Sequence, residues 1–598
     1  MSVSGNDKLF AMRHSAAHVL AAAVLELFPE AKLGVGPVIE HGFYYDFDLP
    51  QSLTPKDLER IEQRMKKIIS RNEVFKREEV SIGDAEGLMK KFSQHLKLEL
   101  IHDLKKKGTT KLKEDELMDV LPGAKTVTLY HTGRFVDLCQ GPHVESTKEI
   151  GAFKLTKIAG AYWRGNSKNK MLQRVYGVLF PTERELKTHL TLLEEAEKRD
   201  HRKLGKELKL FAFSEIVGSG LPLFTPEGTL IRILLTDYVQ SLQEPLGYER
   251  VWIPHLAKSD LYKTSGHWEK FREDLFQVRG GTGSEFVLKP MNCPHHIQLY
   301  ASEKRSYRDL PIRYAEVTTV YRDEQVGELL GLERVRSITQ DDAHVFAMPS
   351  QILYECTSII TLIKKFYKTF NMPLEARLSL RDMSNPQKYL GGNDVWNASE
   401  AALRTVLTKS KFKFKEEEGE AAFYGPKIDF IARDSIERVW QLATIQLDFN
   451  QPERFKLSFV DSDGKEKRPI MIHRAIMGSI ERFMAILIEH YGGAFPLWLS
   501  PIEVAVMPVG KSHMAFSKKL RDTLKKEGLR VRLFDAHETI GYKIRSAEKL
   551  KIPYMLVIGD KEKSGKKLTV RKRGSPRMTT KTIQQFIREV KTLADKRA

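Results

Sequence analysis

The segment TERELKTHLTLLEEAEKRDHRKLGKEL, which runs from Thr182 to Leu208, places the strongest limit on how this chain can fold. Acidic and basic side chains are interleaved along it at helical spacing, and it offers little apolar surface to bury. It therefore predicts a long exposed helix that joins two separately folded parts. The length of 598 residues allows about three or four domains. We expect a domain of residues 1–183, followed by a linker helix of residues 184–204.

The sequence on either side of this segment shows different patterns. Residues 1–183 alternate helical runs, His14–Phe28 and Pro55–Arg71, with short strand-like runs such as GFYYDFDL. Residues 205–499 have strand-like runs between helices, but neither strict strand–helix alternation nor a glycine-rich phosphate loop, which argues against a doubly wound nucleotide-binding fold. Residues 500–598 do alternate, and they predict a small α/β domain with a mostly parallel sheet. The whole chain is predicted to be a multidomain α+β protein.

Positive charge is concentrated at the C-terminal end. Residues 500–598 contain 25 Lys and Arg against 10 Asp and Glu, which leaves a net charge of +15 out of the formal +19 of the chain. Such a basic domain indicates a polyanionic partner, with nucleic acid as the first candidate. A solvated basic face on an ordinary domain explains the charge equally well.

The cysteines and the N-terminus suggest where the protein resides. Cys139, Cys293 and Cys356 are far apart in the sequence, so they suit a reducing cytosol better than a disulfide framework. The N-terminus lacks the basic and apolar regions of a secretion signal. The longest apolar stretch, Val19–Phe28, is too short to span a bilayer and contains Glu26. We expect a soluble cytoplasmic protein without membrane contact.

Two arginines are candidates for holding a triphosphate where no phosphate loop exists. They are Arg322 in VYRDE and Arg482 in AIMGSIERF. Gly478 is predicted to lie one helical turn before Arg482 on the same face, which leaves room for a ligand beside the guanidinium. Each arginine taken alone is more typical of a surface or structural residue.

Three segments that contain these arginines resemble a known set in order and spacing: LFTPEGTLIRILL, VTTVYRDE with LERVRSITQDDAHVF, and MIHRAIMGSIERF. They resemble the three signature motifs of class II aminoacyl-tRNA synthetases. The resemblance implies an antiparallel sheet, with ATP bound in bent form together with magnesium. Arg322 then holds the α-phosphate, Glu324 the adenine, and Arg482 lies over the base near the γ-phosphate. The implied ATP-binding residues are Arg322, Glu324, Arg334, Gln441, Thr444 and Arg482, and the implied catalytic residues are Arg322, Arg482 and His267.

A Cys-His-His set identifies the amino acid. Cys293 in KPMNCPHH, His344 in QDDAHVF and His473 in MIHRAI come from distant segments. Each by itself fits a buried cysteine or a satisfied histidine, whereas three protein ligands with an open position are typical of a working zinc site. All three fall on the zinc positions of the threonyl-tRNA synthetase family. The resemblance implies one zinc per chain that binds the amine and hydroxyl of L-threonine, and a threonine pocket lined by Gln340, Asp342, Tyr424 and Gln446.

Selectivity requires a second site. A site that binds the hydroxyl rejects valine, but serine lacks only a methyl group, worth roughly 1–3 kcal/mol. HSAAH and DLCQGPH supply two further pairs, which as a bare pattern fit either another zinc site or two unrelated pairs. They resemble the editing domain shared by threonyl and alanyl enzymes, and the resemblance implies hydrolysis of mischarged Ser-tRNA(Thr) without a second zinc. The implied editing residues are His14, His18, Tyr45, Asp137, Cys139 and His143.

The basic C-terminal region resembles the anticodon-binding domain of the family. Glu562 in GDKE and Arg571 in TVRKR fall on its anticodon-reading positions, and the implied partner is tRNA(Thr). The first class II motif normally builds a dimer interface, so the resemblance also implies a homodimer. It covers the chain from about Met12 to the end. Bacterial members usually carry a further small N-terminal domain, and the resemblance implies a bacterial-type member without it.

Four positions depart from the family pattern: His295 replaces a glycine, Leu442 and Ala443 replace Cys-Gly, and Ile338 replaces an aromatic residue that stacks on adenine. We expect an altered affinity for ATP and an unchanged reaction. One alternative is a non-enzymatic RNA-binding paralogue, against which the retained arginines and zinc ligands argue. Another is a class II synthetase for serine or proline, against which the Cys-His-His set and the editing domain argue. The predicted function is ATP-dependent attachment of threonine to tRNA(Thr) through threonyl-adenylate, with editing.

Overall fold

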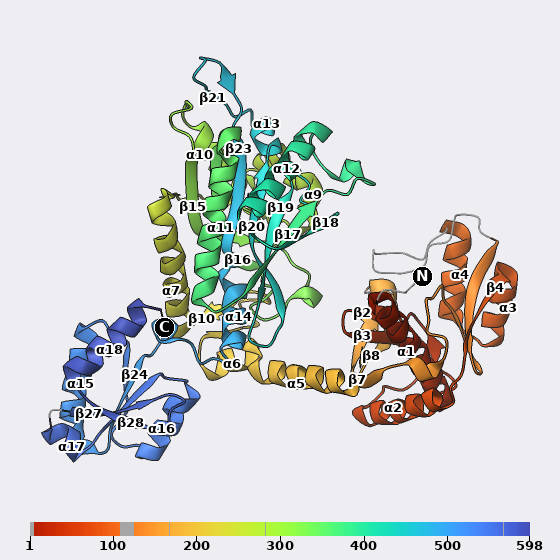
Figure 1. Ribbon diagram of the computed structural model, residues 1–598, viewed down its shortest axis with the longest axis horizontal. Helices are drawn as coiled ribbons and strands as arrows, with labels where there is room; N and C mark the ends of the chain where they lie inside the picture. The colour runs from red at the N-terminus through yellow and green to blue at the C-terminus, as the bar shows by residue number, and fades with distance from the viewer. Residues whose placement is uncertain (1–4, 108–124, 167, 282, 566, 598) are drawn as a thin grey trace. The chain divides into compact units, whose positions relative to one another are not determined.

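The computed structural model describes residues 5–107, 125–166, 168–281, 283–565 and 567–597. The chain forms two compact units, Met1–Glu194 and Glu195–Ala598, which we call the N-terminal and C-terminal units (Figure 1). Each has its own buried apolar core. Among the described residues, no helix is long and apolar enough to cross a membrane.

The N-terminal unit is built from two sheets. The first has the strand order β1-β3-β8-β7, with β2 paired to β3, and helices α1 and α2 pack on it. The second has the order β4-β5-β6, with α3 packed on it and α4 beside α3. The elements are α1 (Gly5–Leu27), β1 (Lys32–Leu33), β2 (Val38–Ile39), β3 (Gly42–Asp48), α2 (Pro55–Ser70), β4 (Phe75–Ser81), α3 (Ile82–Lys91), α4 (His95–Lys107), β5 (Thr126–Thr132), β6 (Phe135–Leu138), β7 (Ala152–Tyr162) and β8 (Met171–Phe180).

Local sequence explains the two helices that were expected here. Helix α2 begins where the Asp57 carboxylate accepts the Thr54 N–H at 3.0 Å, and Pro55 occupies the first helical position, where its missing N–H costs nothing. Helix α1 begins nine residues before the predicted His14. Its run of alanine, valine and leucine is buried against the first sheet.

The charged segment of residues 182–208 forms two helices rather than the single helix that was predicted. Helix α5 (Glu183–Arg199) is exposed as predicted, with Leu186 as its one buried residue. It ends because Asp200 caps a new helix, α6 (His201–Glu207), by accepting the Arg202 N–H. Helix α6 is packed into the C-terminal unit, where Leu204 joins the core, so the prediction of an exposed helix is wrong for this part. The domain limits drawn from the sequence stay a prediction.

The C-terminal unit contains an eight-stranded sheet with the order β11-β15-β16-β23-β20-β19-β17-β18. The five central pairings are antiparallel and the two outermost are parallel, which confirms the antiparallel sheet that the resemblance to class II synthetases implies. The strands are β11 (Glu249–Arg250), β15 (Ile312–Tyr321), β16 (Ser337–Ala347), β17 (Leu374–Leu380), β18 (Phe414–Glu418), β19 (Lys427–Arg433), β20 (Val439–Asp448) and β23 (Ile470–Ser479).

Three long helices, α7 (Pro226–Gln243), α11 (Ile352–Thr369) and α14 (Ile480–His490), contact one another and pack on this sheet. Side chains alternate between the two faces of a strand. In β16, Ala343 and Val345 therefore join the core with these helices, while His344 and Phe346 lie on the opposite face. On that face Phe346 packs in a smaller cluster with Cys293.

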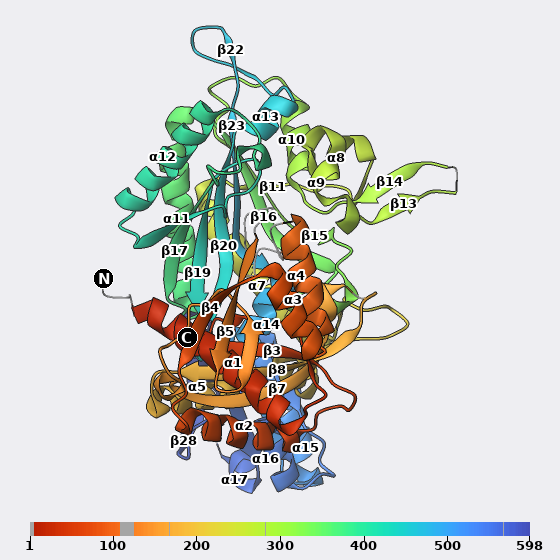
Figure 2. The same ribbon diagram turned by 90° about the vertical axis from the view of Figure 1, so that its right-hand side faces the viewer.

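Short elements surround this second face. Helix α8 contacts both α9 and α10, and the three helices lie together (Figure 2). The remaining elements of this region are β9 (Phe211–Ala212), β10 (Leu223–Phe224), β12 (Leu256–Ala257), α8 (Ser259–Ser265), α9 (His267–Phe271), β13 (Gln277–Arg279), β14 (Glu285–Leu288), α10 (Cys293–Ala301), α12 (Asn393–Lys409), α13 (Asn450–Arg454), β21 (Phe459–Val460) and β22 (Glu466–Lys467).

The last hundred or so residues form a five-stranded sheet with the order β25-β24-β26-β27-β28. The pairings of β24 with β25 and β26 are parallel, and those of β27 with β26 and β28 are antiparallel, so the predicted mostly parallel sheet is wrong for the last two strands. The connection from β26 to β27 is too short for a parallel crossover. The elements are β24 (Val504–Pro508), α15 (Met514–Lys526), β25 (Val531–Leu533), α16 (Ile540–Lys549), β26 (Tyr554–Ile558), α17 (Asp560–Ser564), β27 (Lys567–Lys572), β28 (Met578–Thr582) and α18 (Ile583–Asp595).

Candidate active sites

A cysteine and two histidines from three elements meet on the second face of the central sheet. Cys293 begins α10, His344 lies in β16, and His473 lies in β23 directly opposite His344. One ligand atom from each lies within 4.8 Å of the other two, and all three side chains are buried. The structure therefore brings together the three residues predicted as zinc ligands.

Both histidines are oriented by a second polar group. His473 Nε2 lies 2.9 Å from Asp448 Oδ2, which leaves Nδ1 for a metal. His344 Nδ1 lies 2.8 Å from His296 Nδ1, which leaves Nε2. Burial lowers the pKa of His344 well below its ordinary value, so this imidazole is neutral, the form that binds metals. A buried thiol and two oriented imidazoles fit a zinc ion.

Three of the four residues predicted to bind threonine lie next to this set, Asp342 beside His344 and Tyr424 and Gln446 beside His473. The fourth, Gln340, lies further along β16, opposite Ser479. Gln340 and Asp342 flank a register shift in the pairing of β16 with β23, and Asp342 accepts a hydrogen bond from the Asn292 amide at 3.0 Å. The Tyr424 hydroxyl donates to Gln446 Oε1 at 3.0 Å. The amide nitrogen of Gln446 is buried and has no hydrogen-bond partner among the described residues. Such a buried donor is a group that a polar substrate satisfies.

Of the two arginines predicted to hold ATP, one lies directly after β15 and the other at the start of α14. Arg322 follows β15, and its Nε donates to the Pro290 carbonyl at 3.4 Å. Arg482 lies in the first turn of α14, with its guanidinium carbon 5.9 Å from the centre of the Trp440 ring. Its Nε is buried without a partner among the described residues, so a donor for an anionic ligand is available there.

Three of the other predicted ATP-binding residues contact side chains of the protein itself, and the fourth is exposed. Glu324 and Arg334 lie in the loop of residues 322–336 and pair with each other at 2.7 Å. Arg334 also contacts Glu328 at 2.8 Å. In β20, the Thr444 hydroxyl lies 3.3 Å from Asp429 Oδ1 and Gln441 is exposed.

The glycine beside Arg482 is not on the helix where it was predicted. Gly478 belongs to the end of β23 and has a left-handed φ of +74°, because helix α14 starts only at Ile480. The Ser479 hydroxyl fixes that start by accepting the Arg482 N–H at 3.3 Å. A Cβ on Gly478 would lie 3.1 Å from the Leu442 carbonyl oxygen, so the residue lets two strands approach closely rather than making room on a helix.

The four residues that depart from the family pattern lie in different environments. Leu442 and Ala443 are both buried in the main core, because a bulge in the pairing of β19 with β20 lies at this point. Ile338 is a half-buried residue of β16. His295 is buried in α10, and neither ring nitrogen has a partner among the described residues. Burial lowers the pKa of His295 to about 4.

His267 begins helix α9 and is buried. Its Nδ1 lies 2.7 Å from the Ser265 hydroxyl, and its ring centre lies 6.2 Å from that of Tyr424, which belongs to the predicted threonine pocket. Burial, with the nearby charges of His473 and Arg322, lowers its pKa to about 3. The imidazole is therefore neutral at physiological pH.

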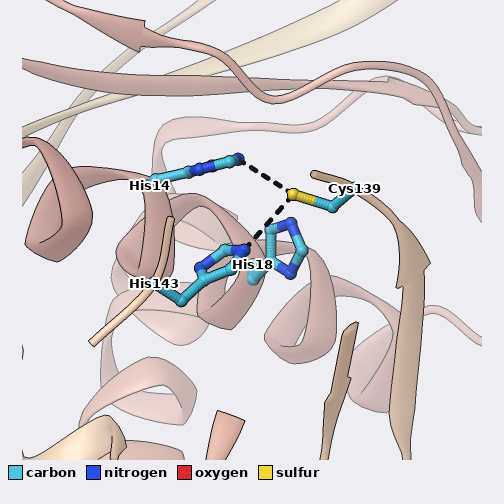
Figure 3. A group of neighbouring side chains, drawn as sticks. All are labelled: His14, His18, Cys139 and His143. Carbon is cyan, nitrogen blue, oxygen red and sulfur yellow. Dashed lines mark hydrogen bonds between the residues drawn. The ribbon is translucent and has the colours of Figure 1, made fainter. Parts of the chain in front are cut away.

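A separate cluster in the N-terminal unit surrounds a thiol (Figure 3). Helix α1 supplies His14 and His18, and the segment after β6 supplies Cys139 and His143. The Cys139 sulfur lies 3.3 Å from Nε2 of His14 and 3.3 Å from Nε2 of His143. One ligand atom from each of the four lies within 4.8 Å of the others. The sequence-predicted group is thus brought together by elements that are more than a hundred residues apart.

The buried carboxylate of Asp137 joins the other members of the cluster. It accepts a hydrogen bond from the Tyr45 hydroxyl at 2.5 Å, and it lies 3.9 Å from His18 Nε2. Its second oxygen lies 2.7 Å from the ammonium of Lys97 in α4. Lys97 is buried and was missed by the sequence analysis, since a single lysine in KLEL carries no spacing signal.

Burial keeps the cluster uncharged. It raises the pKa of the Cys139 thiol to about 12 and lowers the pKa of His14 to about 4 and that of His143 to about 2. Neutral imidazoles beside a protonated thiol accept and donate protons without a resident charge, which suits positioning a water molecule.

The two predicted anticodon-reading residues converge on one strand. Glu562 in α17 accepts a hydrogen bond from Thr569 of β27 at 2.6 Å and another from the Gly559 N–H at 3.0 Å. Burial opposes its ionisation, but these bonds leave its pKa below the ordinary value. Arg571, two residues after Thr569 and on the same face of β27, pairs with Glu548 at 2.8 Å.

Comparisons with known families match three regions of the chain. Residues 276–491 match the tRNA synthetase class II core domain (G, H, P, S and T). Residues 503–593 match the anticodon-binding domain. Residues 127–176 match the threonyl and alanyl tRNA synthetase second additional domain.

Individual relatives agree with these matches. The threonine–tRNA ligase of Halalkalibacterium halodurans is 46% identical over 99% of this chain and 90% of its own length. Threonine–tRNA ligase 1 of Bacillus subtilis is 45% identical over 98% of this chain and 89% of its own. The crystal structure of the RNA-binding domain of the Cryptosporidium parvum threonyl-tRNA synthetase is 36% identical, with a TM-score of 0.63 over 66% of this chain and 98% of that one. The chain belongs to the threonine–tRNA ligase family of class II aminoacyl-tRNA synthetases.

Proposed function

We propose that the chain activates L-threonine with ATP on the second face of the central sheet and transfers it to tRNA(Thr), and that it hydrolyses mischarged Ser-tRNA(Thr) in the N-terminal unit. The observation that carries the choice of amino acid is the meeting of Cys293, His344 and His473 beside the free amide of Gln446. A zinc ion held by three protein ligands keeps open coordination positions, which suit an amine and a hydroxyl on neighbouring carbons.

Cys293, His344 and His473 would hold one zinc ion, and a zinc ion there supplies Lewis-acid binding of the hydroxyl that valine lacks. The surrounding residues orient the amino acid. The Asp342 carboxylate would accept a hydrogen bond from the threonine amine, and Tyr424 with Gln446 would offer a hydroxyl and an amide to the remaining polar groups. Gln340 closes the β16 side of the pocket. Burial of these groups makes each unpaired polar atom costly, which sharpens the rejection of analogues without a hydroxyl.

ATP, as its magnesium complex, would be held by the loop of residues 322–336 and by the start of α14. Arg322 and Arg482 place two guanidinium forks on the phosphates, where bidentate contacts are strongest. Glu324 would accept from the adenine amine, and Arg334, now paired with Glu324, would turn to the phosphates. Thr444 and Gln441 would line the other side of the nucleotide. The neutral imidazole of His267 would accept a proton during transfer to the tRNA.

Editing would use the cluster around Cys139. The imidazoles of His14 and His143 would hold the attacking water, and Asp137 would fix Tyr45 and Lys97 toward the seryl group. The seryl ester differs from the threonyl ester by one methyl group, which the side chains of this cluster would have to exclude sterically.

The five-stranded C-terminal sheet would read the anticodon, with Arg571 and Glu562 near the bases and the surrounding lysines on the phosphates. We also propose a homodimer. Five apolar side chains around α7 are 44–99% exposed, Phe213, Ile216, Val217, Leu223 and Ile233, and Trp252 after β11 is 86% exposed. An apolar surface of this kind is typical of a protein interface.

Amino-acid-dependent pyrophosphate exchange with all twenty amino acids, together with metal analysis of the same sample, tests the proposal. We expect exchange with threonine, weaker exchange with serine, none with valine, and about one zinc per chain. Exchange with proline alone, or full exchange by zinc-free protein, would contradict it.

A further inference from the structure

The side chain of His201 is held at both nitrogens by two different parts of the C-terminal unit. It is the first residue of α6 and is 1% exposed. Its Nε2 accepts the backbone N–H of Leu332 at 3.1 Å. Because Nε2 accepts, the proton of the neutral imidazole lies on Nδ1, which donates to Glu489 Oε1 at 2.7 Å.

The first contact lies in the loop that is proposed to bind ATP. Leu332 follows Glu324 and precedes Arg334 in the loop of residues 322–336, and it is fully buried in the core that also holds Leu204 of α6. Gly331 before it has a left-handed φ of +50°. A Cβ there would clash with Nε2 of His201, so the loop backbone rests directly on the imidazole.

The second contact lies on the helix that carries the other proposed ATP arginine. Glu489 is in the last turn of α14, whose first turn holds Arg482. The Glu489 carboxylate also pairs with Arg438 at 2.5 Å, and the Arg438 guanidinium lies 5.1 Å from the Trp440 ring that faces Arg482. Burial opposes ionisation of Glu489, but hydrogen bonds from His201 leave its pKa below the ordinary value.

A metal is not needed to explain this group. Asp200, His201 and Glu489 do offer three ligand atoms within 4.8 Å. However, both ring nitrogens of His201 are already hydrogen-bonded, and the Asp200 carboxylate pairs with the Arg202 guanidinium at 3.0 Å. The set is a hydrogen-bonded anchor between three segments.

We infer that His201 is a positioning residue for ATP: it ties the loop of residues 322–336 to helix α14, so that the segments carrying Arg322 and Arg482 keep one spacing. The inference rests on the proposed roles of these arginines. The imidazole suits the task because it combines an acceptor and a donor at a fixed distance on a rigid ring.

Two amide variants separate the two bonds. His201→Asn places a donor near the position of Nδ1 and keeps the bond to Glu489, but it cannot reach Leu332. His201→Gln places its amide near the position of Nε2, and its oxygen can accept from the Leu332 N–H. The tie to α14 remains in both variants, because the backbone N–H of residue 201 also donates to Glu489 Oε1, at 2.9 Å in the wild-type chain. We expect the Kd for ATP, measured by calorimetry, to rise about tenfold in His201→Asn and to stay within about twofold in His201→Gln. The exposed Lys203→Gln on the same helix is the control.

Gly331→Ala attacks the same contact from the loop side and is expected to weaken ATP binding to a similar extent, with the double variant Gly331→Ala/His201→Asn no weaker than either single one. A merely structural role would lower the melting temperature of both amide variants equally and leave the Kd for ATP unchanged, which would overturn the inference. Wild-type protein that binds ATP but shows no threonine-dependent exchange would contradict the proposed function instead.

Discussion

At the scale of single residues, chemistry depends on a few buried side chains whose protonation is fixed by their surroundings. Cys293 and Cys356 are both buried and unpaired cysteines, but only Cys293 has histidines as neighbours. We expect Cys293→Ser to lose the zinc and at least about a hundredfold of threonine-dependent exchange, because a three-ligand site loses its thiolate. Cys356→Ala is the matched control and should keep both. Metal analysis and exchange on the two variants decide the matter.

The histidines of the editing cluster lead to a pH prediction. The pKa of His14 is lowered to about 4, while an unfolded histidine titrates near 6.5. Between these values the unfolded chain binds more protons, so the free energy of unfolding falls as the pH drops from about 6.5 toward 4 and is constant above. His14→Gln should give a smaller pH slope. Calorimetric melting of the full chain at pH 7, 6 and 5 checks this, and equal slopes in the two proteins would refute it.

Only some of the residues in the two candidate sites could be predicted from the sequence. Cys293, His344 and His473 were found because they recur at motif positions, and His296 stood in the same KPMNCPHH segment but was not singled out. Lys97 was not found. Its contact with Asp137 exists only because α4 and the end of β6 pack together across forty residues of sequence, and no local pattern records such packing.

At the scale of elements, side-chain alternation in β16 and β23 separates a core face from a polar face, and one glycine allows the strand to turn into α14. Gly478→Ala should destabilise the protein by about 1–2 kcal/mol, because a non-glycine residue is strained at a left-handed φ. It should also weaken ATP binding, because the new methyl group presses on the Leu442 carbonyl in the strand whose Trp440 ring lies 5.9 Å from the Arg482 guanidinium. Gly464 has a similar φ of +77° with nothing within 4 Å of a Cβ. Gly464→Ala should therefore lose similar stability in denaturant unfolding and keep its affinity for ATP.

Element types were predicted better than element limits. The missing strand–helix alternation, a property of the whole region, excluded a doubly wound fold, whereas the antiparallel core was implied by the resemblance of the three motifs. Helix α5 ends at Arg199 because the Asp200 side chain caps the next helix. The pattern of alternating charges continues past this point, so it did not reveal the break. The alternation of strands and helices predicted a mostly parallel sheet, but β27 is antiparallel to β26 because the connection between them is too short for a crossover.

At the scale of the whole molecule, the central sheet, the C-terminal sheet and the N-terminal unit should lose their activities independently of one another. Arg571→Ala is expected to weaken aminoacylation of tRNA while threonine-dependent exchange stays within about twofold, because adenylate formation needs no anticodon contact. Both activities are measured on one preparation. A parallel fall in the two would mean that the C-terminal sheet supports the catalytic core rather than reading tRNA.

Proofreading should be lost without loss of synthesis. We expect Cys139→Ala, or His14 and His18 both changed to Ala, to let Ser-tRNA(Thr) accumulate while Thr-tRNA(Thr) forms at a nearly normal rate. Deacylation of preformed Ser-tRNA(Thr) is the direct measurement, with Cys356→Ala as the control. If these variants hydrolyse Ser-tRNA(Thr) as fast as the wild type, the N-terminal unit takes no part in editing.

The exposed helix α5 has a consequence for the order of events. Its 17 residues make a rod about 26 Å long, so the hydrolytic cluster is tethered to the chain that makes the error. A tethered site can meet a misacylated end within the same molecule, without a second bimolecular encounter. We therefore expect an added excess of editing-competent chain to rescue an editing-deficient one poorly during a single turnover. Errors would be removed mainly by the molecule that made them, before the tRNA is released.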